Sequence, residues 1–207
     1  SWLFAREDRL LRVEEDRLAR IASSTLLVSQ AEAALLRSRL SEPGRANVKS
    51  LGNGIDFAAF DPAATVAHPE LAATPGPHFL FTGQMDYPPN IAAVQRFAGS
   101  ILPEMRRSHP AAQFHIVGRA PTADVRALDG KGGVRVWGEV AAVQPFLVGA
   151  DLVVAPLTIA RGIQNKVLEA MAMARPALLT PEAATGIVAI DGVHFAVAES
   201  DADLLAR

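Results

Sequence analysis

The sequence predicts an α/β fold: a Rossmann-like parallel sheet with helices on both faces, preceded by a shorter segment of helices and strands. Two observations and one general rule support this prediction. From residue 78 onward, short apolar runs alternate with amphipathic runs of helical period, a pattern typical of parallel sheets. Right-handed crossovers between parallel strands place helices on both faces. Several of the apolar runs also end in glycine, which marks sharp turns at the end of a strand.

The first part of the chain contains one long charged helix. Phe4, Leu11 and Leu18 recur every seven residues, so we expect an amphipathic helix over residues 3–21 that packs on its own domain. A coiled coil or a helix that binds a partner is the alternative. The next predicted elements are, in order, a strand at 24–29, a helix at 31–40, a strand at 48–51 and an exposed link rich in Ala, Pro and Thr at 61–77.

The regular alternation follows Pro77. The expected strands occupy residues 78–82, 113–117, 134–137, 152–155 and 176–179. The expected helices occupy residues 90–108, a short stretch after Pro121, and residues 141–149 and 165–174. Gly83, Gly118 and Gly138 end three of these strands, and Gly162 follows a fourth. In open α/β sheets ligands bind outside the carboxyl ends of the strands, so these glycines predict a binding crevice there.

Composition excludes several classes of function. The formal net charge of the 207-residue chain is −2, which argues against nucleic acid as a partner. Because the chain has no cysteine, disulfides, thiolate metal sites and cysteine nucleophiles are excluded. No apolar run approaches the roughly 20 residues that a membrane span needs. The five histidines are scattered; His115 alternates within a strand and is expected to be a packed core residue.

The most informative segment is an apolar strand, a glycine turn and a helix that carries one carboxylate. The strand ends near Leu157, the turn contains Gly162, and the helix carries Glu169. Glycine lets the backbone approach a ligand, and the amides at a helix N-terminus attract phosphate. An acidic side chain beside such a site accepts hydrogen bonds from ribose hydroxyls. This combination predicts a nucleotide-sugar site.

Several short motifs, in order and with regular spacing, resemble the second, donor-binding domain of GT-B glycosyltransferases, in the large retaining family called group 1 or family 4. The matching segments are 53–56 (NGID), 81–85 (FTGQM), 116–118 (IVG), 136–140 (VWGEV), 150–156 (ADLVVAP) and 167–172 (VLEAMA). The resemblance covers residues 24–198. It implies three parts: residues 1–50 as the tail of an N-terminal acceptor domain, residues 51–77 as a connector, and residues 78–207 as the C-terminal nucleotide-sugar-binding domain. Residues 84–90 and 162–166 also look like a bacterial branch linked to exopolysaccharide synthesis.

The sequence departs from the family pattern at two places. Where the family has two glutamates spaced E-x7-E, the first position is Arg161 and only Glu169 remains. Where the family has an arginine and a lysine for the diphosphate, this chain has Gln84, with Asn90 near the lysine position. The positive charge must then come from other residues, and the candidates are Arg119, Lys166 and Arg161.

The resemblance implies transfer of a sugar from a nucleotide-diphosphate sugar to a hydroxyl acceptor, with retained anomeric configuration. Glu169 would hold the ribose, residues 138–140 would border the base, and the amides of residues 162–167 would face the diphosphate. The complete set of expected donor-binding residues is Gly83, Gln84, Gly118, Arg119, Gly138, Glu139, Val140, Arg161, Gly162, Asn165, Lys166, Val167 and Glu169. The nucleotide sugar is a substrate, so no cofactor is expected, and the sequence assigns no metal ligand and no catalytic residue.

The expected acceptor is a glycan or a lipid-linked sugar bound by the N-terminal domain, in the cytoplasm or at the inner face of the membrane. We expect the 207-residue chain alone to bind donor weakly and to transfer little sugar. One alternative is a degenerate GT-B module that binds a nucleotide or a partner without catalysis. A sugar-nucleotide 2-epimerase is another, although no obvious set of acid–base residues is present. A generic dinucleotide fold is disfavoured because no G-x-G-x-x-G fingerprint follows a strand.

Overall fold

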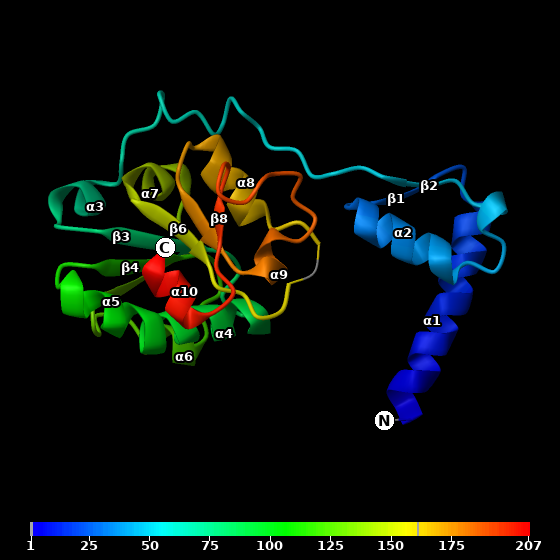
Figure 1. Cartoon of the computed structure of the whole chain (residues 1–207), viewed down its shortest axis with the longest axis horizontal. Coiled ribbons are helices and arrows are strands. Elements are labelled where there is room, and N and C mark those ends of the chain that lie inside the picture. Colours follow the sequence, from blue (N-terminus) through cyan, green and yellow to red (C-terminus); the bar gives the residue numbers. More distant parts are fainter. Residues whose placement is uncertain (1, 161) are drawn as a thin grey trace. The chain divides into compact units, whose positions relative to one another are not determined.

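The computed structural model describes residues 2–160 and 162–207. The chain forms two compact units, Ser1–Asn53 and Gly54–Arg207, which are described separately below (Figure 1). Within the described residues, every helix is too short or too polar to cross a membrane.

The first unit is a small α/β segment. Its elements are α1 (Trp2–Ile21), β1 (Thr25–Leu27), α2 (Gln30–Arg39), a 3₁₀ turn (Pro43–Arg45) and β2 (Val48–Ser50). Strands β1 and β2 pair in parallel, and α2 forms the crossover between them. Ser29 caps α2 by accepting a hydrogen bond from the Glu32 N–H at 3.2 Å, which satisfies one of the unpaired amides of the first turn.

The long helix α1 does not pack as the sequence suggests. Phe4, Leu11 and Leu18 are 72%, 61% and 48% exposed, and Ala19 is the buried residue of the helix. The reason is the small size of the unit: its core consists of Ala19, Ala33, Leu40 and Val48. A cluster of this size leaves most of the apolar stripe of α1 in solvent. The C-terminal end of α1 packs on its own unit as expected, through Ala19 and the Asp16–Ser41 hydrogen bonds, but the apolar stripe of the helix does not.

The second unit has a six-stranded sheet in which every pairing is parallel. The strands are β3 (His78–Thr82), β4 (Gln113–Val117), β5 (Val134–Gly138), β6 (Leu152–Ala155), β7 (Ala177–Leu179) and β8 (Ala196–Val197). Their order in the sheet is β5-β4-β3-β6-β7-β8, as in a doubly wound Rossmann fold. The chain grows outward from β3 in one direction and from β6 in the other. The junction between β3 and β6 is therefore the switch point of the sheet.

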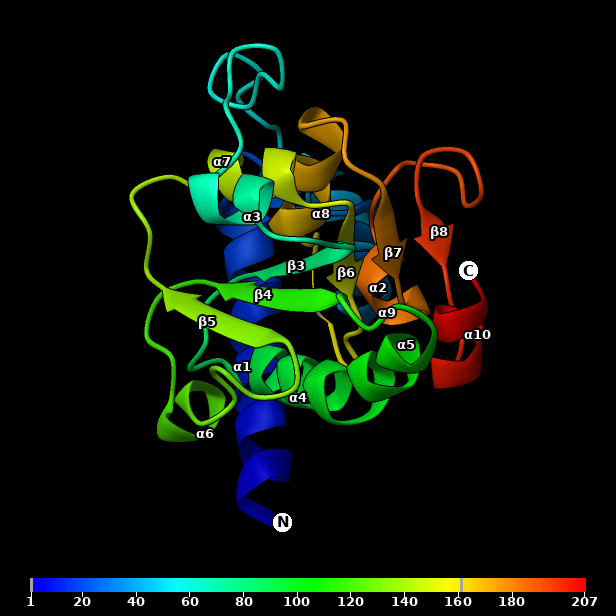
Figure 2. The ribbon, with the colours of Figure 1, turned by 90° about the vertical axis from the view of Figure 1, so that its left-hand side faces the viewer.

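Helices cover both faces of this sheet, as predicted (Figures 1 and 2). One face carries α3 (Pro69–Ala73), α7 (Gln144–Gly149) and α8 (Asn165–Ala172). The other carries α4 (Pro88–Arg96), a π-helical turn (Phe97–Ile101), α5 (Leu102–Ser108) and α6 (Ala123–Arg126). Helices α9 (Pro181–Ala184) and α10 (Asp201–Ala206) complete the unit.

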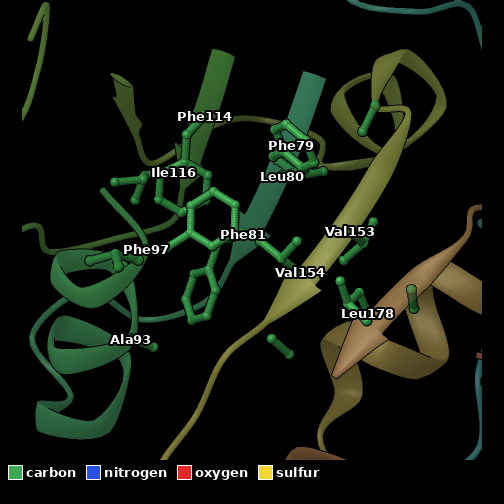
Figure 3. Close-up of a cluster of buried hydrophobic side chains, with 14 of the residues drawn as sticks. Phe79, Leu80, Phe81, Ala93, Phe97, Phe114, Ile116, Val153, Val154 and Leu178 are labelled. Carbon is green, nitrogen blue, oxygen red and sulfur yellow. The ribbon is translucent and has the colours of Figure 1, made fainter. Parts of the chain in front are cut away.

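Aromatic side chains fill the centre of the core (Figure 3). Phe81, Phe97 and Phe114 are fully buried, and the Phe97 and Phe114 rings lie 4.4 Å apart between centroids. Val153 and Val154 of β6 continue the cluster across the sheet (Figure 3). Burial of this apolar surface is the main force that holds the strands in register.

The structure adds elements that the sequence patterns do not reveal. The expected exposed link at residues 61–77 contains α3, because Pro69 starts a helical turn whose Leu71 is buried against Gly149 of α7. The helix expected at 141–149 begins only at Gln144. Strand β8 and helices α9 and α10 are too short for a periodic signal. The expected helix at 90–108 is helical throughout, with the π-helical turn in its middle.

Candidate functional site

A cleft of about 500 Å³ opens at the carboxyl ends of the central strands, beside the switch point. Its walls come from the ends of β3 and β4, from the segment between β5 and α7, and from the first turns of α8. The lining residues are Thr82, Gly83, Val117, Gly118, Arg119, Glu139, Val140, Ala141, Ala142, Val143, Gln144, Asn165, Lys166 and Glu169. Crevices at this position are the usual ligand sites of open α/β sheets.

Two glycines form the floor of the cleft because no side chain fits there. Gly83 and Gly118 have φ angles of 153° and 155°, which residues with a side chain rarely adopt. A Cβ atom on Gly118 would lie 1.6 Å from the Gly83 carbonyl oxygen. A Cβ atom on Gly83 would lie 2.9 Å from Asn90 Nδ2 and 3.2 Å from Lys166 Nζ. The two strand ends therefore pack backbone to backbone and leave main chain exposed to a ligand.

Lys166 brings a buried cation to this floor. Its side chain is 8% exposed, and Nζ donates a hydrogen bond to Asn90 Oδ1 at 2.9 Å. The ammonium group also lies 4.0 Å from the centroid of the Phe81 ring, a cation–π contact. Burial lowers the pKa of Lys166 to about 7, and the nearby Glu169 carboxylate opposes this shift. A buried ammonium group whose charge is balanced only by one amide oxygen and a nearby carboxylate is well suited to bind an anion.

Glu169 lies three residues farther along α8 and lines the same cleft. Its side chain is partly buried, and burial raises the pKa of its carboxyl group, whereas Lys166 lowers it. The carboxyl is therefore neither sealed in the interior nor fully hydrated. A carboxylate in this position can accept hydrogen bonds from hydroxyl groups of a ligand in the cleft.

Arg119 supplies a second positive charge at the rim. It is exposed, and its Nη2 donates to Gln84 Oε1 at 2.8 Å. Gln84 in turn accepts a hydrogen bond from Asn90 Nδ2 on its backbone carbonyl at 2.9 Å. The loops after β3 and β4 are thus tied together, and the Arg119 side chain is held at the mouth of the cleft.

A second polar cluster lies on the same sheet, away from the cleft. Trp137 Nε1 donates to His115 Nδ1 at 3.2 Å, His115 Nε2 lies 3.0 Å from His78 Nδ1, and His78 Nε2 lies 3.0 Å from the Thr74 carbonyl. Indole N–H only donates and a carbonyl only accepts, so one neutral tautomer of each histidine satisfies the whole chain: both carry the proton on Nε2. Burial, and then the neighbouring His78, lower the pKa of His115 to about 4. His115 is 2% exposed and is a packed core residue, as predicted.

Comparison with known families decides which class this site belongs to. The sequence pattern of the family Glycosyl transferases group 1 matches residues 76–207, which is more than half of the chain and includes the whole cleft. The chain belongs to the group 1 glycosyltransferases. Comparison with curated protein sequences gave no match.

Solved glycosyltransferases share the fold of this group 1 chain. Anabaena HepE in complex with UDP and glucose is 18% identical, with a TM-score of 0.67, over 95% of this chain and 55% of that chain. A glycosyltransferase from Rickettsia africae is 14% identical, with a TM-score of 0.68, over 93% of this chain and 54% of that chain. The C-terminal domain of the group 1 protein LpcC from Francisella tularensis is 16% identical, with a TM-score of 0.55, over 74% of this chain and 85% of that domain. The chain thus spans about half the length of the larger structures that it matches.

The structure of this glycosyltransferase chain brings most of the predicted donor-binding residues together. Those that line the cleft are Gly83, Gly118, Arg119, Glu139, Val140, Asn165, Lys166 and Glu169. Gln84 borders it through Arg119, and the Gly138 carbonyl accepts a hydrogen bond from the Gly118 N–H at 2.8 Å. Gly162 precedes α8 without lining the cleft, and Arg161 lies outside the described residues.

Val167 is not brought to the cleft. Its side chain is fully buried in the core, and its N–H donates to the Gln164 carbonyl at 2.9 Å. This residue therefore offers neither a side chain nor an amide to a ligand. Helical periodicity explains why Val167 does not reach the cleft: Lys166 and Glu169 share one side of α8, whereas Val167 points to the sheet.

The sequence analysis missed Thr82, Val117 and residues 141–144, which also line the cleft. Asn90 was noticed only as a departure from the family pattern, yet it holds the Lys166 ammonium. One signal was available for Thr82: it is the polar last residue of an otherwise apolar buried run, directly before a glycine turn.

Proposed function

We propose that this chain is the donor-binding part of a retaining glycosyltransferase that moves a sugar from a nucleotide-diphosphate sugar to a hydroxyl acceptor. The observation that carries the proposal is the cleft at the switch point, where a buried Lys166 ammonium, a partly buried Glu169 carboxyl and bare glycine backbone meet. A nucleotide-diphosphate sugar presents the matching chemistry: an anionic diphosphate, pentose hydroxyls and a flat base.

The residues of the cleft suit the chemistry of the leaving group. When the glycosidic bond to the donor breaks, negative charge grows on the departing diphosphate. Lys166 at the floor and Arg119 at the rim would neutralise that charge. Glu169 would accept hydrogen bonds from the ribose, and the backbone around Val140 would border the base. These are roles on the donor side of the reaction, and the acceptor would bind to another part of the whole protein.

The solved structures and two sequence motifs indicate which substrates to test first. The HepE structures hold UDP and glucose or UDP-glucose, so a UDP-sugar is the first donor to test. The motifs at residues 84–90 and 162–166 favour a role in bacterial exopolysaccharide or other envelope glycan synthesis. We propose a glycan or lipid-linked acceptor, a cytoplasmic location with peripheral membrane association of the whole protein, and no cofactor.

The second candidate is a degenerate module that binds a nucleotide or a partner without catalysis. The sequence feature that favours it is Arg161, which stands where the family usually has the glutamate that faces the donor sugar. A positive charge in place of that glutamate would change the contacts available to the donor sugar.

Calorimetric titration with UDP, GDP and ADP tests the proposal. We expect one of these nucleotides to bind, and Glu169→Ala to weaken its binding about tenfold, as expected for loss of a charged hydrogen-bond acceptor. Glu182→Ala, which removes an exposed glutamate of α9, is the matched control and should bind as the wild type does. Absence of binding to all three nucleotides would contradict the proposal.

A turnover assay separates the two candidates at the level of the whole protein. With donor and acceptor panels, the full-length protein should transfer sugar, whereas the 207-residue chain should bind nucleotide and transfer little. Full-length protein that binds nucleotide without any transfer would favour the degenerate module. Robust transfer by the 207-residue chain would refute our assignment of it to the donor side alone.

A further inference from the structure

The hydroxyl group of Thr82 is a buried polar group without a partner. Thr82 is the last residue of β3 and is 4% exposed. Within the part of the chain that the structure describes, Thr82 Oγ1 makes no hydrogen bond. Buried hydroxyls in proteins are nearly always hydrogen-bonded, because an unmade hydrogen bond costs the full desolvation of the group. The position therefore calls for a partner other than the side chains around it.

A second buried threonine shows how the fold treats such a residue when its role is structural. Thr180 follows the end of β7 and is also 4% exposed. Its hydroxyl donates to the Leu157 carbonyl at 2.6 Å and lies 3.3 Å from the Ala155 carbonyl. The two threonines have the same chemistry and the same burial, and they differ in whether the protein itself completes their hydrogen bonds.

The surroundings of Thr82 indicate what its partner is. The residue lines the cleft together with Gly83 and Lys166. Because a Cβ atom on Gly83 would be 3.2 Å from Lys166 Nζ, the residue next to Thr82 lies directly beside the ammonium group. A hydroxyl donor and a buried cation at one end of a cleft are the combination that binds phosphate oxygens. Valine has the same shape as threonine and would remove the unpaired group, so a hydroxyl here serves a ligand better than it serves the fold.

We propose that the Thr82 hydroxyl donates a hydrogen bond to the diphosphate of the bound nucleotide sugar. The Lys166 ammonium binds the same diphosphate. This inference rests on the proposed function and adds a specific donor-binding residue that neither the sequence motifs nor the comparisons assign. Thr82 and Lys166 both line this cleft, where a departing diphosphate would have to be stabilised.

The test is a pair of measurements, UDP affinity and thermal stability, on three variants of the 207-residue chain; GDP or ADP replaces UDP if it binds more tightly to the wild type. Thr82→Val should weaken binding about tenfold, as expected for one hydrogen bond to a charged group, and its melting temperature should equal or exceed that of the wild type. Thr82→Ser keeps the hydroxyl and should bind within about twofold of the wild type. Thr180→Val is the matched control, and it should lower the melting temperature and leave the affinity unchanged.

The alternative outcomes overturn the inference in distinguishable ways. If Thr82→Val binds the nucleotide as the wild type does, the hydroxyl does not contact the ligand. If Thr82→Val lowers the melting temperature, with or without weaker binding, the hydroxyl serves the fold through an ordered water. If the wild type binds none of the three nucleotides, the proposed function fails and this inference fails with it. If the wild type binds a nucleotide and Thr82→Val binds it equally well, the proposed function stands and the inference about Thr82 is wrong.

Discussion

Strand β3 begins and ends with polar residues that have opposite surroundings. His78 at its start and Thr82 at its end point to the same face, since side chains alternate along a strand. At the start, the hydrogen bonds run without interruption from Trp137 through His115 and His78 to the Thr74 carbonyl. At the end, the Thr82 hydroxyl has no partner among the described residues, and Thr82 lines the cleft together with Lys166.

The contrast between the two ends of β3 shows how a polar group that stabilises the fold differs from one that is available to a ligand. Both regions contain a basic side chain whose pKa is lowered by burial, His115 to about 4 and Lys166 to about 7. A pKa shift alone therefore does not mark the functional group. Completion of the hydrogen bonds and access to a cleft mark it instead. Among the described residues His68 Nδ1 is also buried without a hydrogen-bond partner, but its ring is packed against Phe146 and Trp137.

Replacement of Lys166 should give the largest effect on nucleotide binding. We expect Lys166→Met to weaken UDP binding at least about a hundredfold, because a charged donor to the diphosphate is lost. The same change should raise the free energy of unfolding by about 1–2 kcal/mol, since a poorly compensated buried charge is removed. Titration calorimetry and denaturant unfolding measure the two effects, with Lys131→Met at an exposed site as the control. A variant that is less stable and binds UDP normally would place Lys166 in the fold rather than in the site.

Replacement of His115 should have the opposite pattern. His115→Leu leaves the Trp137 N–H without its acceptor and removes the donor to His78. We expect the free energy of unfolding to fall by about 2–4 kcal/mol, because each unpaired buried group costs about 1–3 kcal/mol. UDP affinity should stay within about twofold of the wild type. A large loss of affinity in a folded variant would show that the histidine cluster is part of the site.

Acid should destabilise the protein through the same histidine. Since the pKa of His115 is about 4 in the folded state and 6.5 ordinarily, the unfolded chain takes up a proton between these values that the folded chain refuses. Stability is therefore full above pH 6.5 and falls as the pH drops toward 4, by up to about 3 kcal/mol from this group. Chemical unfolding at several pH values measures the loss, and subtraction of the His115→Leu curve removes the contribution of carboxylates. Parallel curves for the two proteins would contradict the assignment.

Proton uptake on UDP binding should give the smallest signal, and it reports the protonation state of Lys166 directly. At pH 8 most Lys166 side chains are neutral, because burial lowers the pKa to about 7. A bound diphosphate favours the charged ammonium, so UDP binding should take up a fraction of a proton at pH 8 and almost none at pH 6. Titrations in buffers with different ionisation enthalpies report this number. Equal uptake at both pH values, or the same uptake in Lys166→Met, would contradict it.

The sequence predicted the parts of the fold that depend on local patterns. Residues 152–155 form a continuous apolar run, residues 113–117 alternate between polar and apolar side chains, and the structure has the same bounds for both strands. The glycines after β3 and β4 predicted the edge of the sheet where the cleft lies. Strand β8 has only two residues, too few for any periodicity.

The parts that escaped prediction depend on pairs of residues far apart in the chain. Lys166 meets Asn90 from 76 positions away, and His78 meets His115 from 37 positions away. Such pairs leave no trace in spacing or composition. Whether the Thr82 hydroxyl has a hydrogen-bond partner depends on all the residues that surround it in space, so only the folded structure reveals that it has none among the described residues. The exposure of the apolar stripe of α1 could not be predicted for a related reason. Amphipathic periodicity does not indicate how much surface the rest of a small unit supplies for packing.

The contact between the ends of β3 and β4 also limits how this sequence can vary. A Cβ atom at Gly118 would come within 1.6 Å of the Gly83 carbonyl oxygen, so no mutation at position 118 is compatible with the present backbone. Variation in the cleft must therefore arise in its walls, at residues 139–144 and along α8, while the floor stays constant. Saturation mutagenesis with selection for folding alone should tolerate many substitutions in those walls and reject almost every one at Gly118.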